Sequence, residues 1–144
     1  MKRIAALFLA GAVALVGCSG GSDITTDNGI PSDCGLPTPS PGLRTRLVPA
    51  YFVLEGAEIA MVQRRRGGYV AAINLPYSVT PALGRYREVL GEQGYEELGI
   101  DNEGFEAEVF FRSGKQIGQI QIRQSICEDA TVAFVNVVSR ETMR

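Results

Sequence analysis

The feature that most constrains the fold is a single segment with helical periodicity, between Thr80 and Gly94. Thr80 and Pro81 are residue types preferred at the N-cap and at the first helical position. Gly94 is typical of the residue that follows a helix, with Tyr95 placed to pack back on it. The apolar side chains of the segment recur at steps of three and four residues, which makes one stripe of Leu83, Tyr86, Val89 and Leu90. The sequence therefore predicts one amphipathic helix.

Short alternating or continuous apolar segments surround this helix and predict strands. They cover residues 57–63, 69–75, 105–111, 117–123 and 131–138. Ser113, Gly114 and Lys115 predict a tight hairpin turn, and Gly118 is interpreted as a bulge. The order β-β-α-β-β-β predicts an α+β fold, with a largely antiparallel sheet of about five strands and one helix packed on one face.

Apolar side chains occur on both faces of the predicted sheet, because Phe110 and Phe134 alternate with Phe111 and Val135 along the strands. One helix covers only one face. We therefore predict that the apolar segment from Leu47 to Leu54 covers the face away from the helix, with a partner site on that face as the alternative.

The first seventeen residues have the pattern of a signal peptide, with Lys2 and Arg3 before an apolar stretch from Ile4 to Val16. This stretch is shorter than the about 20 residues that a membrane-spanning helix needs. Leu15 to Cys18 resembles the lipobox of bacterial lipoproteins. The resemblance implies cleavage before Cys18 and acyl chains on it that anchor the protein in a membrane; the alternative is an ordinary secretory peptide.

Residues 18–43 are predicted to form the lipidated cysteine and a tether, and residues 44–144 a small α+β domain. The tether is rich in Pro, Gly and Ser and has few large apolar side chains. Pro37, Pro39 and Pro41 favour an extended polyproline conformation that holds the domain away from the bilayer.

Cys34 and Cys127 are the only cysteines besides Cys18. Because an exported domain reaches an oxidising compartment, we interpret them as one disulfide. The sequence leaves two unpaired thiols as the alternative.

Composition excludes several classes of chemistry. The absence of histidine removes Ser-His and Cys-His nucleophile pairs and histidine metal ligands. A net charge of -2 is unsuited to non-specific nucleic-acid binding. Ser113 and Lys115 are interpreted as a turn rather than a catalytic pair, because an exposed lysine keeps its proton. We therefore expect no enzyme, no cofactor, no metal site and no nucleic-acid partner.

Two charged clusters remain. Eight acidic residues and no basic residue fall between Glu88 and Glu108, and they are interpreted as solvated faces rather than as a calcium or cationic-partner site. Arg64, Arg65 and Arg66 lie between two predicted strands and are the candidates for contact with an anion, such as a lipid headgroup, a wall polymer or an acidic partner. A solubilising role for these arginines is the alternative.

Four short features recur in a known group of proteins: the segments Leu54 to Ile59, Leu90 to Tyr95 and Gly114 to Gly118, and Cys127 before the last strand. By these features the chain resembles uncharacterised exported lipoproteins of high-GC Gram-positive bacteria. The resemblance implies a small exported domain behind a tether and assigns no activity.

These observations predict a lipid-anchored cell-envelope lipoprotein that displays a non-enzymatic binding domain for a protein or a wall component. The alternative is a structural subunit of an envelope export or wall-building complex. The domain is expected on the extracytoplasmic side of the cell membrane or the outer membrane, anchored through acyl chains on Cys18, and its oligomeric state is left open.

Overall fold

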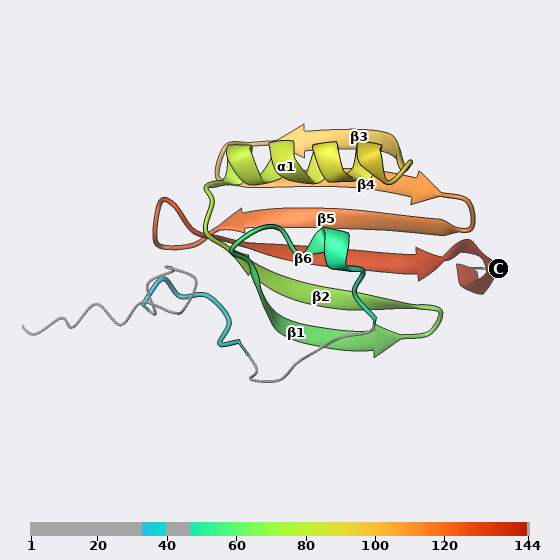
Figure 1. Cartoon of the computed structure of the whole chain (residues 1–144), viewed down its shortest axis with the longest axis horizontal. Helices are drawn as coiled ribbons and strands as arrows, with labels where there is room; N and C mark the ends of the chain where they lie inside the picture. Colours follow the sequence, from blue (N-terminus) through green and yellow to red (C-terminus); the bar gives the residue numbers. More distant parts are fainter. Residues whose placement is uncertain (1–32, 40–46, 144) are drawn as a thin grey trace, which may run out of the picture.

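A computed structural model of the chain describes residues 33–39 and 47–143. The fold is α+β, with one six-stranded antiparallel sheet and a single α-helix in these residues (Figure 1). The strand order is β1-β2-β6-β5-β4-β3. The elements are η1 (Ala50–Phe52), β1 (Glu58–Arg65), β2 (Gly68–Leu75), α1 (Val79–Glu92), β3 (Glu96–Asn102), β4 (Glu106–Ser113), β5 (Gln116–Gln124), β6 (Thr131–Ser139) and η2 (Arg140–Met143). The predicted signal peptide, Cys18 and most of the tether lie outside the described residues.

The sheet has one strand more than the sequence predicts, and the missed strand is β3. Its segment contains two adjacent glutamates, an internal glycine and a terminal Asp-Asn pair, so it has neither strict alternation nor high strand propensity. All of its residues except Gly99 are exposed, and none is buried. Pairing with β4 holds this segment extended at the edge of the sheet, with an irregularity between Glu97 and Gly99. Tertiary pairing therefore decides its conformation.

The predicted helix is present, and it begins two residues earlier than Thr80–Pro81 indicates. Ser78 is the N-cap and Val79 is the first helical residue. Val79 is buried, so packing extends the helix to it. Pro81 still falls in the first turn, where backbone N–H groups lack a helical partner.

The C-terminal end of α1 follows the prediction. Gly94 has φ +71°, and the Tyr95 N–H donates to the Leu90 carbonyl at 2.8 Å while the Gly94 N–H donates to the Gly91 carbonyl at 3.0 Å. This pair of bonds is the Schellman motif that a glycine in the left-handed region permits. The residues around Gly94 were therefore sufficient to predict where the helix ends.

The segment from Leu47 to Leu54 lies on the same face as the helix, so the prediction that it covers the opposite face is wrong. α1 packs against β3, β4 and β5 and leaves the β6 and β2 part of that face uncovered. The segment with η1 lies over β6 in this remainder (Figure 1). Its Val48, Phe52 and Leu54 side chains belong to the main core. Both covering elements meet where the Tyr86 hydroxyl donates to the Phe52 carbonyl at 3.2 Å.

The opposite face of the sheet is mixed rather than a second core. The strand register places Phe134 beside Gln121 and Glu108 in one row, so apolar side chains alternate with polar ones across the strands. Met61 and Phe110 are exposed on this face. Residues 33–39 cover its margin, because the Asn74 amide donates to the Pro37 carbonyl at 2.7 Å. We call this surface the open face.

Gly118 is not a bulge. The β4–β5 register continues without interruption from Ser113 opposite Gln116 to Glu106 opposite Arg123. The glycine is instead required by packing, because a Cβ at this position would lie 2.3 Å from Cζ of Phe111. The Phe111 ring takes the place of the missing side chain in the core.

Burial of three tyrosines gives a prediction for alkaline solution. Burial raises the pKa of the Tyr69, Tyr86 and Tyr95 phenols far above the ordinary value of 10.0. The unfolded chain releases these protons from about pH 10, whereas the folded chain keeps them. The stability that depends on the neutral phenols is therefore complete below about pH 10 and is lost as the pH rises, by about 1.4 kcal/mol per pH unit for Tyr86.

Urea denaturation between pH 8 and pH 11 measures this loss. The variant Tyr86→Phe is expected to show a shallower dependence on pH than the wild-type chain. Ultraviolet titration of the folded protein supplies the control, because the buried phenols should ionise only with unfolding. A folded protein whose five tyrosines all ionise near pH 10 would contradict the prediction.

Candidate functional site

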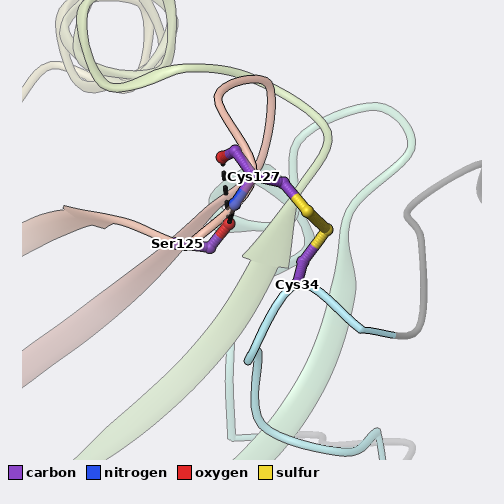
Figure 2. The surroundings of a disulfide bond; sticks show 3 residues. All are labelled: Cys34, Ser125 and Cys127. Atoms are coloured by element: carbon purple, nitrogen blue, oxygen red, sulfur yellow. Dashed lines mark hydrogen bonds between the residues drawn. A yellow bond between two sulfur atoms is a disulfide. The ribbon is translucent and has the colours of Figure 1, made fainter.

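Cys34 and Cys127 meet at one end of the sheet (Figure 2). Their sulfur atoms lie 2.02 Å apart and their Cα atoms 5.1 Å apart, which is the geometry of a disulfide. The Ser125 hydroxyl donates to the Cys127 carbonyl at 3.1 Å and accepts from the Cys127 N–H at 3.0 Å. The Ile126 N–H donates to the Cys34 carbonyl at 3.3 Å. Residues 33–39, predicted as part of the tether, are thus held against the β5–β6 loop.

Asp33 lies beside this disulfide, with a carboxylate oxygen and the two sulfur atoms within 4.8 Å of one another. Sulfur atoms joined to each other are not thiolates, and the thiolate is the form that binds metals. The arrangement therefore does not act as a metal site while the sulfur atoms are bonded.

We call this end of the domain the tether pole, because the chain toward Cys18 leaves from it. Exposed acidic side chains surround it, from Asp33 and from the loops after β3 and β5: Glu103, Glu128 and Asp129. The two most exposed large apolar side chains of the described residues, Phe105 at 60% and Ile126 at 81%, lie in the same loops. The tether pole is therefore acidic, with isolated apolar side chains.

The three candidate arginines lie at the opposite end of the sheet, at the β1–β2 hairpin. The sequence predicts a basic tip here, and the structure narrows it to a two-residue turn, because Arg64 pairs with Tyr69 and Arg65 with Gly68 inside the ladder. Gly67 has φ +74° in the turn. Gly68 permits close packing, since a Cβ there would lie 1.9 Å from the Val137 carbonyl oxygen. The backbone beneath the arginines is therefore tightly held.

The three arginine side chains do not converge. Arg64 shares the helix-covered face with its cross-strand partner Tyr69, whereas Arg65 shares the open face with Gly68. Arg66 follows them in the turn, and all three are exposed. The hairpin therefore presents its guanidinium groups in different directions rather than around one pocket.

A fourth arginine, which sequence reasoning missed, joins them. The Ser139 N–H donates to the Gly67 carbonyl at 2.8 Å, and the Arg140 N–H donates to the Lys115 carbonyl at 2.7 Å. The end of β6 thus bridges the β1–β2 and β4–β5 hairpin turns and places exposed Arg140 beside the arginine hairpin. The sequence has no signal for this, because it depends on the non-local pairing of β6 with β2.

Arg64, Arg65, Arg66 and Arg140 form what we call the arginine pole. Among residues 33–39 and 47–143, no carboxylate oxygen lies within 4.0 Å of these four guanidinium groups. The other cations at this end are neutralised, since Lys115 pairs with Glu141 and Arg112 with Glu96 at 2.7 Å. The guanidinium beside Glu96 lowers the pKa of that carboxyl. Within the part of the chain that the structure describes, the unpaired positive charge of this end therefore lies on the four arginines.

A cluster of aromatic rings supports the arginine pole from the helix-covered side. The Tyr51 and Tyr95 hydroxyls are hydrogen-bonded at 2.7 Å, and the Tyr95 ring contacts Phe111 edge-on at 5.1 Å between centroids. Tyr69 is the cross-strand partner of Arg64. Its hydroxyl is buried and has no hydrogen-bond partner among the described residues. These rings pack together on the helix-covered face, on the side of the sheet that Arg64 shares with Tyr69.

Part of the acidic cluster surrounds a shallow pocket of about 190 Å³ on β3 and β4, lined by Asp101, Glu103, Glu106, Ala107 and Glu108. The protein itself supplies donors to these carboxylates. The Gln121 amide donates to both Glu106 and Glu108 at 2.7 Å, and Arg123 lies 3.4 Å from Glu106. These contacts of Glu106 and Glu108 are made within the protein, and the interpretation of the acidic cluster as solvated faces stays a prediction.

Comparison of the chain with protein-family models, with curated proteins and with solved structures gives no match. No helix among the described residues has both the length and the apolar character that crossing a bilayer requires. The function must therefore be argued from the two poles themselves.

Proposed function

We propose that this protein is a lipid-anchored lipoprotein of the cell envelope, whose domain is a non-enzymatic binding module for a protein or a wall component. The observation that carries the proposal is the position of the two poles at opposite ends of the sheet. The chain from Cys18 reaches the domain at the Cys34–Cys127 disulfide, whereas the unpaired arginines lie at the other ends of the same strands. An anchor at one pole leaves the other free to bind.

Chain length supports this display. β6 has nine residues, so the poles are separated by about 30 Å at about 3.3 Å per residue. Fifteen residue steps connect Cys18 to Asp33, which limits their separation to about 54 Å at about 3.6 Å per step. A lipid on Cys18 would thus hold the tether pole within about 54 Å of the bilayer, a reach longer than the domain, so that the arginine pole is accessible to a partner in the envelope.

A structural subunit of an envelope complex is the second candidate, and exposed Met61 and Phe110 on the open face favour it. Extension of the sheet by a neighbouring copy is disfavoured, because both edge strands are irregular. β1 has a register shift between Ile59 and Met61, and β3 has one between Glu97 and Gly99. Such irregularities are a common protection of sheet edges.

Substitution of the proposed lipidation site tests the anchor. We expect Cys18→Ser to be released from the membrane fraction by a carbonate wash, because it lacks the sulfur that carries the lipid. The matched control Ser19→Ala should remain in the membrane. Intact mass of the wild-type protein should show a chain that begins at Cys18 and carries diacylglycerol.

Two results would refute the anchor. One is an unmodified Cys18 in the mature wild-type chain. The other is equal retention of the wild-type and Cys18→Ser chains after the wash, with the leader removed from both.

A further inference from the structure

We infer that the arginine pole binds a linear polyanion, a polymer with repeated phosphate or carboxylate groups. This inference names the partner of the proposed binding module and rests on that function. It begins from charge distribution. The chain has 16 acidic and 14 basic residues, so it has no general excess of positive charge. Four unpaired arginines nevertheless gather at one pole, while exposed acids surround the other.

The side-chain chemistry of the pole fits oxyanions. Guanidinium groups form paired hydrogen bonds with phosphate and carboxylate oxygens, and they stay protonated at every physiological pH. In the described part of the chain none of the four has an ion pair that binding would have to break. The donors are therefore available without loss of an internal interaction.

The geometry favours a polymer over a small ion. Arg64 and Arg65 lie on opposite faces of the sheet, and Arg140 extends from a different element. A single phosphate cannot contact all of these groups. Successive anionic groups along a polymer that wraps the hairpin tip can contact them in turn.

The backbone that carries the arginines is already ordered. Gly68 packs directly on the Val137 carbonyl, and two backbone hydrogen bonds from Ser139 and Arg140 fasten the two hairpin turns together. Binding therefore restricts only side chains, and a rigid backbone reduces the entropy lost on association.

A bilayer is a poorer occupant of this pole. Amphipathic surfaces that insert into a bilayer combine basic residues with large apolar side chains that enter the interface. The most exposed large apolar side chains of residues 33–39 and 47–143, Phe105 and Ile126, instead lie at the tether pole. The pole therefore suits a polymer in the aqueous envelope.

The test uses the full chain reconstituted in phosphatidylcholine vesicles, with fluorescent inorganic polyphosphate as the probe. We expect saturable binding that weakens with salt. A plot of log affinity against log salt should have a slope of about -3, because about 0.7 counterion is released for each of four contacts on a flexible polyanion. Orthophosphate at the same phosphorus concentration should not compete.

Two triple variants with the same change in net charge separate the pole from the rest of the surface. R64Q/R65Q/R66Q should bind at least about tenfold more weakly, with a slope near -1. R85Q/R87Q/R123Q removes three exposed arginines elsewhere and should stay within about twofold of wild type. Arg140→Gln alone should weaken binding about two- to threefold. This variant tests whether an arginine outside the β1–β2 hairpin contributes to binding. Circular dichroism confirms folding of each variant.

Three outcomes would overturn the inference: absence of binding by the folded wild-type chain, equal effects of the two triple variants, or complete competition by orthophosphate. A further arm measures cosedimentation of the Cys18→Ser chain with phosphatidylglycerol vesicles. Stronger binding to these vesicles than to polyphosphate would assign the pole to lipid and refute the polymer. Failure of the anchor is seen separately, as an unmodified Cys18 in a chain that still binds polyphosphate.

Discussion

Truncation of Phe52 to alanine is expected to lower the free energy of unfolding by about 3–5 kcal/mol, the usual range for a large side chain removed from a closed core. Phe52 has no exposed surface. Its ring lies 4.7 Å from Tyr51 and 5.8 Å from Phe111 between centroids. The substitution leaves a cavity between the segment 47–54 and the sheet, which urea denaturation monitored by circular dichroism measures.

Phe105→Ala is the matched control, because it removes the same side chain from a position that is 60% exposed. It should change the free energy of unfolding by less than about 0.5 kcal/mol. Equal effects of the two substitutions would show that the segment from Leu47 to Leu54 does not complete the core of the helix-covered face.

This segment also shows what sequence patterns leave undetermined. Alternation along β4 and β6 separates two sets of apolar residues correctly, such as Phe111 and Val135 from Phe110 and Phe134. It does not say which set is covered. Which set is covered depends first on the width of a single helix, which is smaller than that of six strands. It depends also on polar neighbours, such as Gln121, which the register places beside Phe134. The sequence prediction placed the second cover on the wrong face for this reason.

Features encoded by near neighbours were predictable. The helix end at Gly94, the hairpin turn around Gly114 and the basic tip of the β1–β2 hairpin all follow from turn and capping residues within a few positions. Features that depend on distant pairing were not. β3 has a weak strand pattern and is formed by β4, and Arg140 reaches the arginine pole only because β6 ends between two hairpins. The sequence thus located three of the four arginines.

Removal of the disulfide is expected to lower the free energy of unfolding by up to about 4–5 kcal/mol. The cysteines are 93 positions apart, and a cross-link over a loop of this length strongly limits the conformations of the unfolded chain. Urea denaturation of Cys34→Ser/Cys127→Ser against wild type measures the difference. The double variant is used because a single substitution would leave buried Cys34 or its partner as a reactive thiol.

Reductant provides the internal control for this prediction. It should lower the free energy of unfolding of the wild-type chain to about that of the double variant. The free energy of unfolding of the double variant should not change, because that variant has no bond between these positions to reduce. The loss of stability should be accompanied by release of residues 33–39. The bond holds these residues beside Ala130, and the Asn74 amide donates to the Pro37 carbonyl. Hydrogen exchange at the Ile126 N–H, bonded to the Cys34 carbonyl at 3.3 Å, reports that release. Uptake of two alkylating groups by Cys34 and Cys127 in the unreduced exported protein would refute the bond, and the expected loss of stability with it.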